Sequence, residues 1–200
     1  DGDADVLSAS HVDDKIAWHE NLGGGTFGPQ QVITTAADGA TSVYATDLDG
    51  DGDADVLSAS AIDNKIAWYE NLGGGVFGAQ QVIMIVSGAR SVYASDLDGD
   101  GDADVLAAWG GVISWYENLD SGSFGAQQVI SATAGGAQSV YAIDLDGDGD
   151  VDALSASEHG GGIIAWYENT GSGSFGQQQV ISSNAQGARS VYATDLDGDG

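Results

Sequence analysis

The sequence contains no cysteine, a single proline and only four basic residues among its 200 positions. The absence of cysteine excludes a disulfide framework, a thiolate nucleophile and a zinc site with cysteine ligands. The densest apolar run, Val82-Ile83-Met84-Ile85-Val86, is far shorter than a membrane-spanning helix requires. Because 31 acidic residues leave a net charge of −27, nucleic acid and anionic membrane surfaces would be repelled. We therefore expect no nucleic-acid partner and no insertion into a membrane.

A repeat of about 50 residues runs through the whole chain. The string DLDGDGDADVLSAS begins at Asp47 and returns with small changes from Asp96 and from Asp144. The chain opens inside the same string at Asp1 and closes inside it from Asp195. The predicted repeats are residues 1–41, which lack a first strand, then 42–90, 91–138 and 139–189. Residues 190–200 are expected to supply the first strand of a further or ring-closing blade.

Each complete repeat is predicted to form four short strands separated by turn residues. In the second repeat these strands are expected at residues 42–45, 54–60, 65–71 and 80–83. No segment shows a long 3.6-residue apolar period, which argues against helices, and a β-solenoid usually has much shorter repeats. The predicted fold class is all-β: a β-propeller of four-stranded antiparallel blades, with an acidic loop between strands 1 and 2 of each blade.

The lengths of the connections predict two different faces. Length changes only between strands 2 and 3 and between strand 4 and the next strand 1. In an up-and-down blade these two connections lie at the same end, whereas the acidic loop and the turn between strands 3 and 4 lie at the opposite end. One face is therefore expected to be constant and the other variable.

The acidic loops have the spacing D-x-D-x-D-G-x-x-D and hold 21 of the 31 acidic residues. Carboxylates that converge on a tight turn would repel one another without a cation, and a flexible all-oxygen cage suits calcium better than magnesium. The twelfth position, where an EF-hand loop has a bidentate glutamate, is Ser58. We expect one calcium ion in each of three complete loops and one in a loop split across the termini.

The predicted calcium ligands share the odd positions of these loops. By analogy with the EF-hand, positions one, three, five and nine should ligate through side chains and position seven through its carbonyl. The complete set is Asp47, Asp49, Asp51, Asp53 and Asp55; Asp96, Asp98, Asp100, Asp102 and Asp104; Asp144, Asp146, Asp148, Asp150 and Asp152; and, in the split loop, Asp1, Asp3, Asp5, Asp195, Asp197 and Asp199.

The acidic loop followed by a Phe-Gly pair resembles the FG-GAP / VCBS repeat family. The pairs are Phe27-Gly28, Phe77-Gly78, Phe124-Gly125 and Phe175-Gly176. The resemblance covers essentially the whole chain. It implies an integrin-α-like, calcium-stabilised propeller that acts outside the cell in adhesion or in the recognition of protein or glycan ligands.

No catalytic constellation is evident in the sequence. His11 and His159 lie in variable connections, and His19 replaces a tyrosine of the other repeats. The repeated Glu-Asn pair after strand 3 is interpreted as structural, with the asparagine shaping the turn. The tryptophan of strand 3 is expected to pack between blades, with a stacking platform for sugars as the alternative. Trp109 has no aromatic counterpart in the other repeats and is a candidate ligand contact.

Two functions fit these features, and neither is enzymatic. The first is an extracellular or cell-surface recognition module that binds a protein or glycan on the variable face. The second is a structural subunit of a filament or coat, in which copies of the chain associate through open terminal blade edges. No signal peptide is visible in the sequence.

Overall fold

The protein consists of β-strands and connections only. The computed structural model describes residues 2–159 and 161–198, and no helix occurs in this part of the chain. None of these described elements is a helix that could cross a membrane. The all-β prediction is confirmed.

The strands form four antiparallel sheets, each built from consecutive strands. The first sheet has three strands, β1 (Val6–Ser10), β2 (Lys15–His19) and β3 (Gln31–Thr34). The second contains β4 (Ala40–Thr46), β5 (Asp55–Ser60), β6 (Lys65–Tyr69) and β7 (Gln81–Ile85). The third contains β8 (Ala89–Ser95), β9 (Asp104–Trp109), β10 (Val112–Tyr116) and β11 (Gln128–Ser131). The fourth contains β12 (Ala137–Ile143), β13 (Asp152–Ser157), β14 (Ile163–Tyr167) and β15 (Gln179–Ser182).

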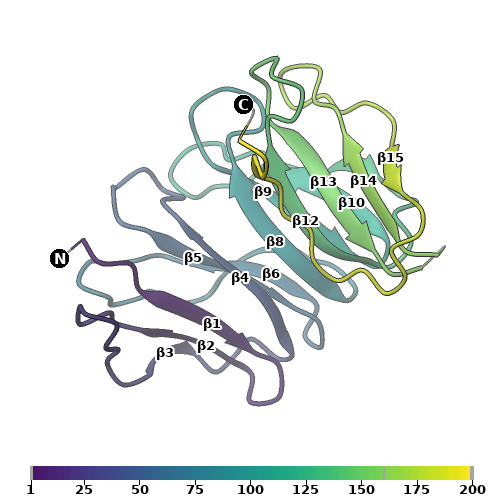
Figure 1. Ribbon diagram of the computed structural model, residues 1–200. Coiled ribbons are helices and arrows are strands. Elements are labelled where there is room, and N and C mark those ends of the chain that lie inside the picture. The colour runs from purple at the N-terminus through teal and green to yellow at the C-terminus, as the bar shows by residue number, and fades with distance from the viewer. Residues whose placement is uncertain (1, 160, 199–200) are drawn as a thin grey trace.

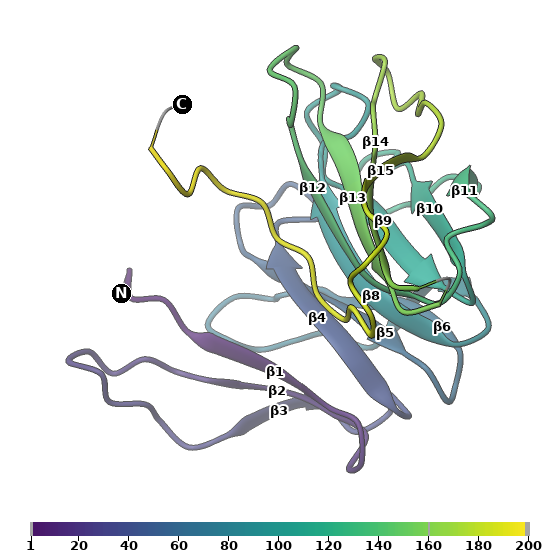
Figure 2. The ribbon, with the colours of Figure 1, turned by 45° about the vertical axis from the view of Figure 1, so that its right-hand side comes forward.

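The four sheets follow one another in space as they do in the sequence. Figures 1 and 2 show the β1–β3 sheet at one end of the molecule and the β12–β15 sheet at the other. The innermost strands β4, β8 and β12 lie next to one another, and their tyrosines form a row of tilted rings that Tyr192 continues. Ring centroids are 4.4 Å apart for Tyr44 and Tyr93, 4.8 Å for Tyr93 and Tyr141, and 4.9 Å for Tyr141 and Tyr192. Within the described residues no sheet closes on itself, so ring closure is not part of the observed fold.

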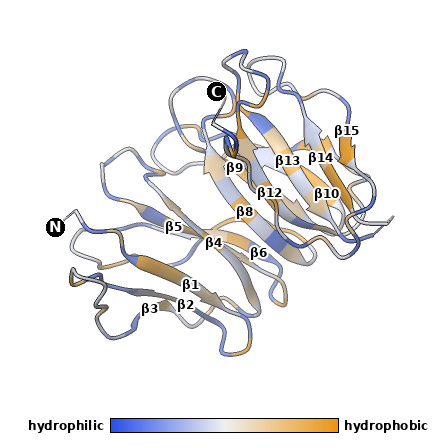
Figure 3. Ribbon diagram, in the orientation of Figure 1, coloured by the Kyte–Doolittle hydropathy of each residue, from blue (hydrophilic) through white to orange (hydrophobic). Residues whose placement is uncertain are grey.

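The hydrophobic core lies between successive sheets. Alternate residues of each strand point to opposite faces, and both faces of β5, β9 and β13 are buried. One cluster joins Leu57 and Trp68 of the second sheet to Val105 and Tyr116 of the third. Burial between sheets therefore holds the repeats together. In Figure 3 the hydrophobic colour falls on the buried strand β10, and also on β1 and β15, which are only partly buried.

The antiparallel order gives the molecule the two faces that the sequence predicts. The acidic loop enters β5, and its Asp53 carboxylate lies near Gly73 of the β6–β7 turn. At the opposite end, the β5–β6 loop contacts the connection that precedes β4, where the Ala61 N–H donates to the Gly39 carbonyl (3.0 Å). We call these ends the acidic face and the variable face.

Candidate metal centres

Each complete acidic loop folds around hydrogen bonds from its own backbone. In the first of them Asp47 accepts from the N–H groups of Gly50 (2.7 Å) and Gly52 (2.9 Å). The two glycines have φ values of +79° and +96°, which residues with a Cβ rarely adopt. The Asp51 N–H donates to Asp49 at 3.2 Å. These bonds wind the loop so that alternate carboxylates turn inward.

A buried aspartate at the ninth position fixes the loop to the sheet. Asp55 is the first residue of β5 and has no exposed surface. Its carboxylate accepts from the Leu48 N–H (2.9 Å) and from the Asn71 N–H (2.7 Å). Asp104 and Asp152 accept the equivalent bonds from Leu97 and Asn118 and from Leu145 and Asn169, at 2.7 to 3.0 Å. The loop, the first strand pair and the end of the third strand thus meet at one carboxylate.

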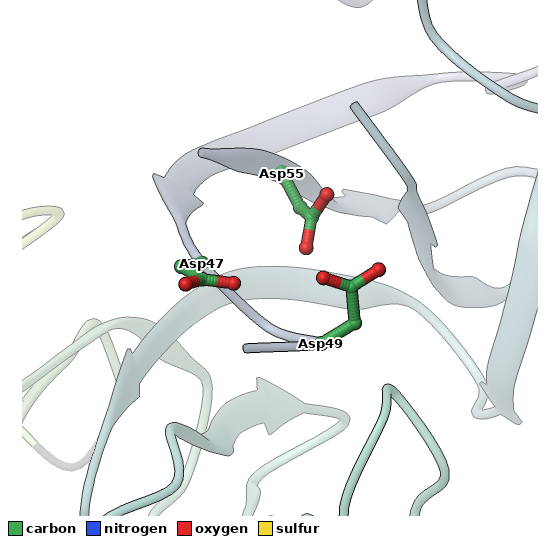
Figure 4. Close-up of side chains that lie close together, drawn as sticks. All are labelled: Asp47, Asp49 and Asp55. Carbon is green, nitrogen blue, oxygen red and sulfur yellow. The ribbon is translucent and has the colours of Figure 1, made fainter. Parts of the chain in front are cut away.

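Three aspartates of each complete loop converge on a common point. Asp47, Asp49 and Asp55 each offer one carboxylate oxygen, and these oxygens lie within 4.8 Å of one another. Figure 4 shows the three side chains turned toward the space between them. The same arrangement occurs for Asp96, Asp98 and Asp104 and for Asp144, Asp146 and Asp152. Each cluster could hold a metal ion through hard oxygen ligands.

The remaining predicted ligands lie outside these clusters. Asp51, Asp100 and Asp148 instead accept from the backbone N–H two residues further on, at 2.9 Å. Their side-chain ligation and the carbonyl ligation of Asp53, Asp102 and Asp150 remain predictions. For the split loop, Asp1 and Asp199 lie outside the described residues. Its described members Asp3, Asp5, Asp195 and Asp197 belong to none of the three clusters.

The clusters concentrate negative charge where solvent is partly excluded. Burial raises the pKa of Asp104 to about 7, with Asp98 and Asp100 adding to the shift and the two backbone N–H donors opposing it. Burial also raises the pKa of Asp55, Asp152 and Asp98. A cation at the centre of each cluster would favour the ionised carboxylates and so offset both the burial and the mutual repulsion that raise these pKa values.

The Glu-Asn pair has two structural roles, one of which the sequence did not reveal. The Asn71 side chain accepts from the Gly73 N–H (3.1 Å), so its predicted role in the turn is confirmed. The Gly78 N–H of the Phe-Gly pair donates to the Glu70 carbonyl (2.8 Å). The missed role is a bond between sheets: Asn118 donates to the Leu48 carbonyl (2.8 Å), and Asn169 to the Leu97 carbonyl (2.7 Å).

The strand-3 tryptophans pack against the next sheet, as predicted. A Cβ added to Gly75 would overlap the Trp18 indole, and Gly122 and Gly173 meet Trp68 and Trp115 in the same way. Each of these glycines lies in the turn between the third and fourth strands of the following sheet. The recurrence of a glycine at this position of every repeat is the feature of the sequence that could have indicated the contact.

The other singled-out residues do not form a joint site. His11 is exposed, the His19 ring contacts the Gly28 carbonyl (3.2 Å), and His159 lies over Gly136. Trp109 packs partly against the core between the second and third sheets. Its indole N–H donates to the Ser114 hydroxyl (3.2 Å), so packing accounts for much of this residue.

Several solved structures resemble this fold, among them a lectin and a biofilm matrix protein. One is an Agrocybe aegerita lectin described for specific recognition of non-reducing terminal N-acetylglucosamine, with a TM-score of 0.60 and 23% identity over 87% of this chain and 48% of the lectin chain. The other is the Vibrio cholerae biofilm matrix protein Bap1, with a TM-score of 0.53 and 20% identity over 92% of this chain and 27% of the other. The chain thus spans about half of the lectin chain and about a quarter of Bap1. At these identities the likeness concerns the fold.

The relation by sequence is to a family of repeats. No curated protein matches the chain. The profile of the FG-GAP-like repeat, by contrast, matches four times, at residues 1–58, 47–107, 96–155 and 144–200, and these matches together cover every residue. The protein therefore belongs to the FG-GAP-like repeat family.

Proposed function

We propose that the chain is a calcium-binding propeller segment that recognises an extracellular ligand. The observation that carries the calcium assignment is the threefold recurrence of the same carboxylate triad. Calcium accepts six to eight oxygen ligands in flexible geometry, and backbone carbonyls and water can complete a triad. Magnesium demands stricter octahedral geometry, which makes it the weaker candidate. One ion in each complete loop would fix the connection between the first and second strands.

Propeller geometry is the arrangement that we propose for the complete assembly. Successive sheets pack through their innermost strands and bury large side chains between them. The same contacts, continued through further sheets, would lead to a ring. A neighbouring segment of the protein, or another copy of the chain, would supply these further sheets.

The proposed role is non-enzymatic recognition outside the cell or at its surface. The variable face differs from repeat to repeat, and a specific ligand site requires such differences. The lectin likeness supports a glycan ligand, and a protein ligand would use the same face. The acidic face carries the carboxylate triads and is suited to hold metal ions. We therefore place the ligand on the variable face.

Calorimetric titration of the metal-free protein tests the metal assignment. We expect at least three calcium ions to bind per chain, with magnesium binding more weakly at equal concentration. Asp49→Asn, Asp98→Asn and Asp146→Asn should each remove about one ion, whereas Asp53→Asn should leave the number unchanged if position seven ligates through its carbonyl. Equal binding of both metals would contradict the calcium assignment.

A structural subunit is the second candidate, and the likeness in fold to a biofilm matrix protein is the observation that favours it. Light scattering in calcium separates the two candidates: large species indicate a filament or coat, and a discrete mass of one or two chains indicates a recognition module.

A further inference from the structure

Among the glycines that precede the first strands β4, β8 and β12, one is uncovered on the variable face. Gly39, Gly88 and Gly136 occupy equivalent positions before β4, β8 and β12, with φ values of +68°, +70° and +68°. Ile62 lies against Gly39, and His159 lies against Gly136. Over Gly88 no atom lies within 4 Å of the place where a Cβ would stand. The third sheet therefore has an opening at a place that a side chain fills in the second and in the fourth sheet.

The length of one loop explains this opening. In the second sheet, residues 61–64 connect β5 to β6 and place the Ile62 side chain over Gly39. In the third sheet, Gly110 and Gly111 alone connect β9 to β10, with φ values of +53° and +90°. A turn of two glycines has no side chain to lay over Gly88. This short connection thus leaves a space that the longer loops of the second and fourth sheets cover with Ile62 and His159.

A pocket of about 240 Å³ with a mixed polar and apolar lining occupies this place, between the third and fourth sheets. Glycines form much of its wall, which leaves backbone groups accessible. The side chains with polar groups come from both sheets: Ser87, Arg90, Gln138, Glu158 and His159.

The pocket offers hydrogen-bond donors and acceptors side by side. Arg90 is exposed and has no ion pair or side-chain hydrogen bond within residues 2–159 and 161–198, whereas Lys15, Lys65 and Arg189 are all ion-paired. Glu158 supplies acceptors; its carboxylate lies 3.4 Å from the Arg189 guanidinium and 3.8 Å from the His159 ring. Gln138 donates to the Gly136 carbonyl (3.3 Å) and keeps an amide oxygen as an acceptor.

We propose that this pocket binds one neutral sugar unit of a glycan, which deepens the proposed recognition function and rests on it. Vicinal hydroxyls both donate and accept, and planar groups such as guanidinium, amide and carboxylate can each bond two of them. The pocket is smaller than the roughly 300–1,000 Å³ typical of drug-sized ligands, which suits a single ring. Glu158 and the net charge of −27 disfavour an anion, and Arg90 disfavours a cation.

Saturation-transfer NMR in millimolar calcium, followed by calorimetry, tests this proposal. The probes are the neutral sugars glucose, galactose, mannose and N-acetylglucosamine, with glucuronic acid and glucosamine as charged counterparts. We expect at least one neutral sugar to bind more tightly than both charged ones. Arg90→Ala should weaken its binding more than tenfold. Lys15→Ala makes the same change of charge on the first sheet and should leave binding unchanged.

A loop exchange separates the pocket from general effects of charge. Replacing Gly110-Gly111 with Ala-Ile-Asp-Asn, the loop of the second sheet, should abolish sugar binding while calcium-dependent melting is retained. Sugar binding that survives both changes would overturn the pocket but leave glycan recognition standing elsewhere. Absence of sugar binding by the wild-type protein would overturn the pocket and leave only protein ligands for the proposed function. Preference for glucuronic acid would overturn the neutral-ligand assignment.

Discussion

The acidic face repeats the same contacts in every complete sheet, whereas the contacts of the variable face change from sheet to sheet. On the acidic face the anchoring bond from the leucine N–H to the buried aspartate measures 2.9, 2.9 and 3.0 Å in the three complete loops. On the variable face the equivalent glycines are covered by an isoleucine, by nothing and by a histidine. The constant end concentrates interactions that hold sheet and loop together, and the variable end tolerates insertion and deletion. In the proposed function, stability and recognition are thus assigned to opposite ends of each strand.

The largest effect is expected for an anchoring aspartate of the acidic face. Asp55→Ala would leave the N–H groups of Leu48 and Asn71 without their acceptor and remove one member of the triad. At about 1–3 kcal/mol for each buried group, the free energy of unfolding should fall by about 4 kcal/mol. Chemical denaturation in calcium measures this loss. Asp53→Ala, in the same loop but exposed, should cost less than about 1 kcal/mol. Equal losses would break the distinction between anchor and surface carboxylates.

The pH dependence of stability should depend on whether calcium is present. The pKa of Asp104 is about 7 in the folded protein, against a reference value of 3.8. In chelator, its stabilising contribution is complete below pH 3.8 and is lost as pH rises toward 7, because folding then requires a buried charge. The change amounts to at most about 4–5 kcal/mol, from about 1.4 kcal/mol for each pKa unit. Asp55 and Asp152 shift in the same direction.

Calcium should reverse this slope, because the metal binds the ionised carboxylates. Denaturation curves between pH 4 and 7, recorded in calcium and in chelator, provide the measurement. Asp104→Asn is the matched variant and should flatten the curve in chelator. Stability in chelator that rises between pH 4 and 7 would contradict the account.

A somewhat smaller effect is expected where the sheets interlock. Gly122→Ala would force a Cβ into the Trp68 indole at a φ of +68°. Overpacking costs about 1–3 kcal/mol and the left-handed backbone about 1–2 kcal/mol, so we expect a loss of about 3 kcal/mol. Gly25→Ala is the matched control: φ is +77°, but nothing lies within 4 Å, so only the backbone cost of about 1 kcal/mol applies. Thermal melting of both variants tests whether the packing contact contributes.

The smallest effect is expected for ion pairs near the variable face. The charged groups of Lys15 and Asp13 are 2.8 Å apart, and the side chains are 31% and 52% exposed. Because exposed pairs contribute about 0–1 kcal/mol, Lys15→Ala should change the free energy of unfolding by less than about 0.5 kcal/mol. If Lys15→Ala lowered the free energy of unfolding as much as Gly122→Ala does, the variable face would also be important for stability, which would contradict the proposed difference between the two faces.

Local features of the fold could be predicted because they repeat within the sequence. The second strand of the second repeat was expected at residues 54–60 and forms at Asp55–Ser60, and the third was expected at 65–71 and forms at Lys65–Tyr69. Alternation of apolar residues and clusters of glycine determine such segments locally. The two extra residues of the third strand lie beyond its end, where Asn71 pairs with Phe77 in an isolated bridge.

Contacts between repeats could not be predicted with the same detail. Within the acidic loop, the spacing predicted that the first, third and ninth positions converge, but not that the fifth accepts from a backbone N–H outside the cluster. The hydrogen bond from the Asn118 side chain to the Leu48 carbonyl joins residues 70 positions apart, so no local sequence pattern predicts it. The pocket beside Gly88 depends on which loop side chain is missing, which becomes visible only when equivalent positions are compared in space.

Thermal melting with and without calcium tests the central claim most directly. With calcium at about ten times its dissociation constant, each site adds about 1.4 kcal/mol, so three sites add about 4 kcal/mol. For a chain of this length, the melting temperature should then rise by about 8–16 °C relative to excess chelator. The triple variant Asp49→Asn, Asp98→Asn, Asp146→Asn should lose most of this rise. A wild-type melting temperature that is the same in calcium and in chelator would contradict the account.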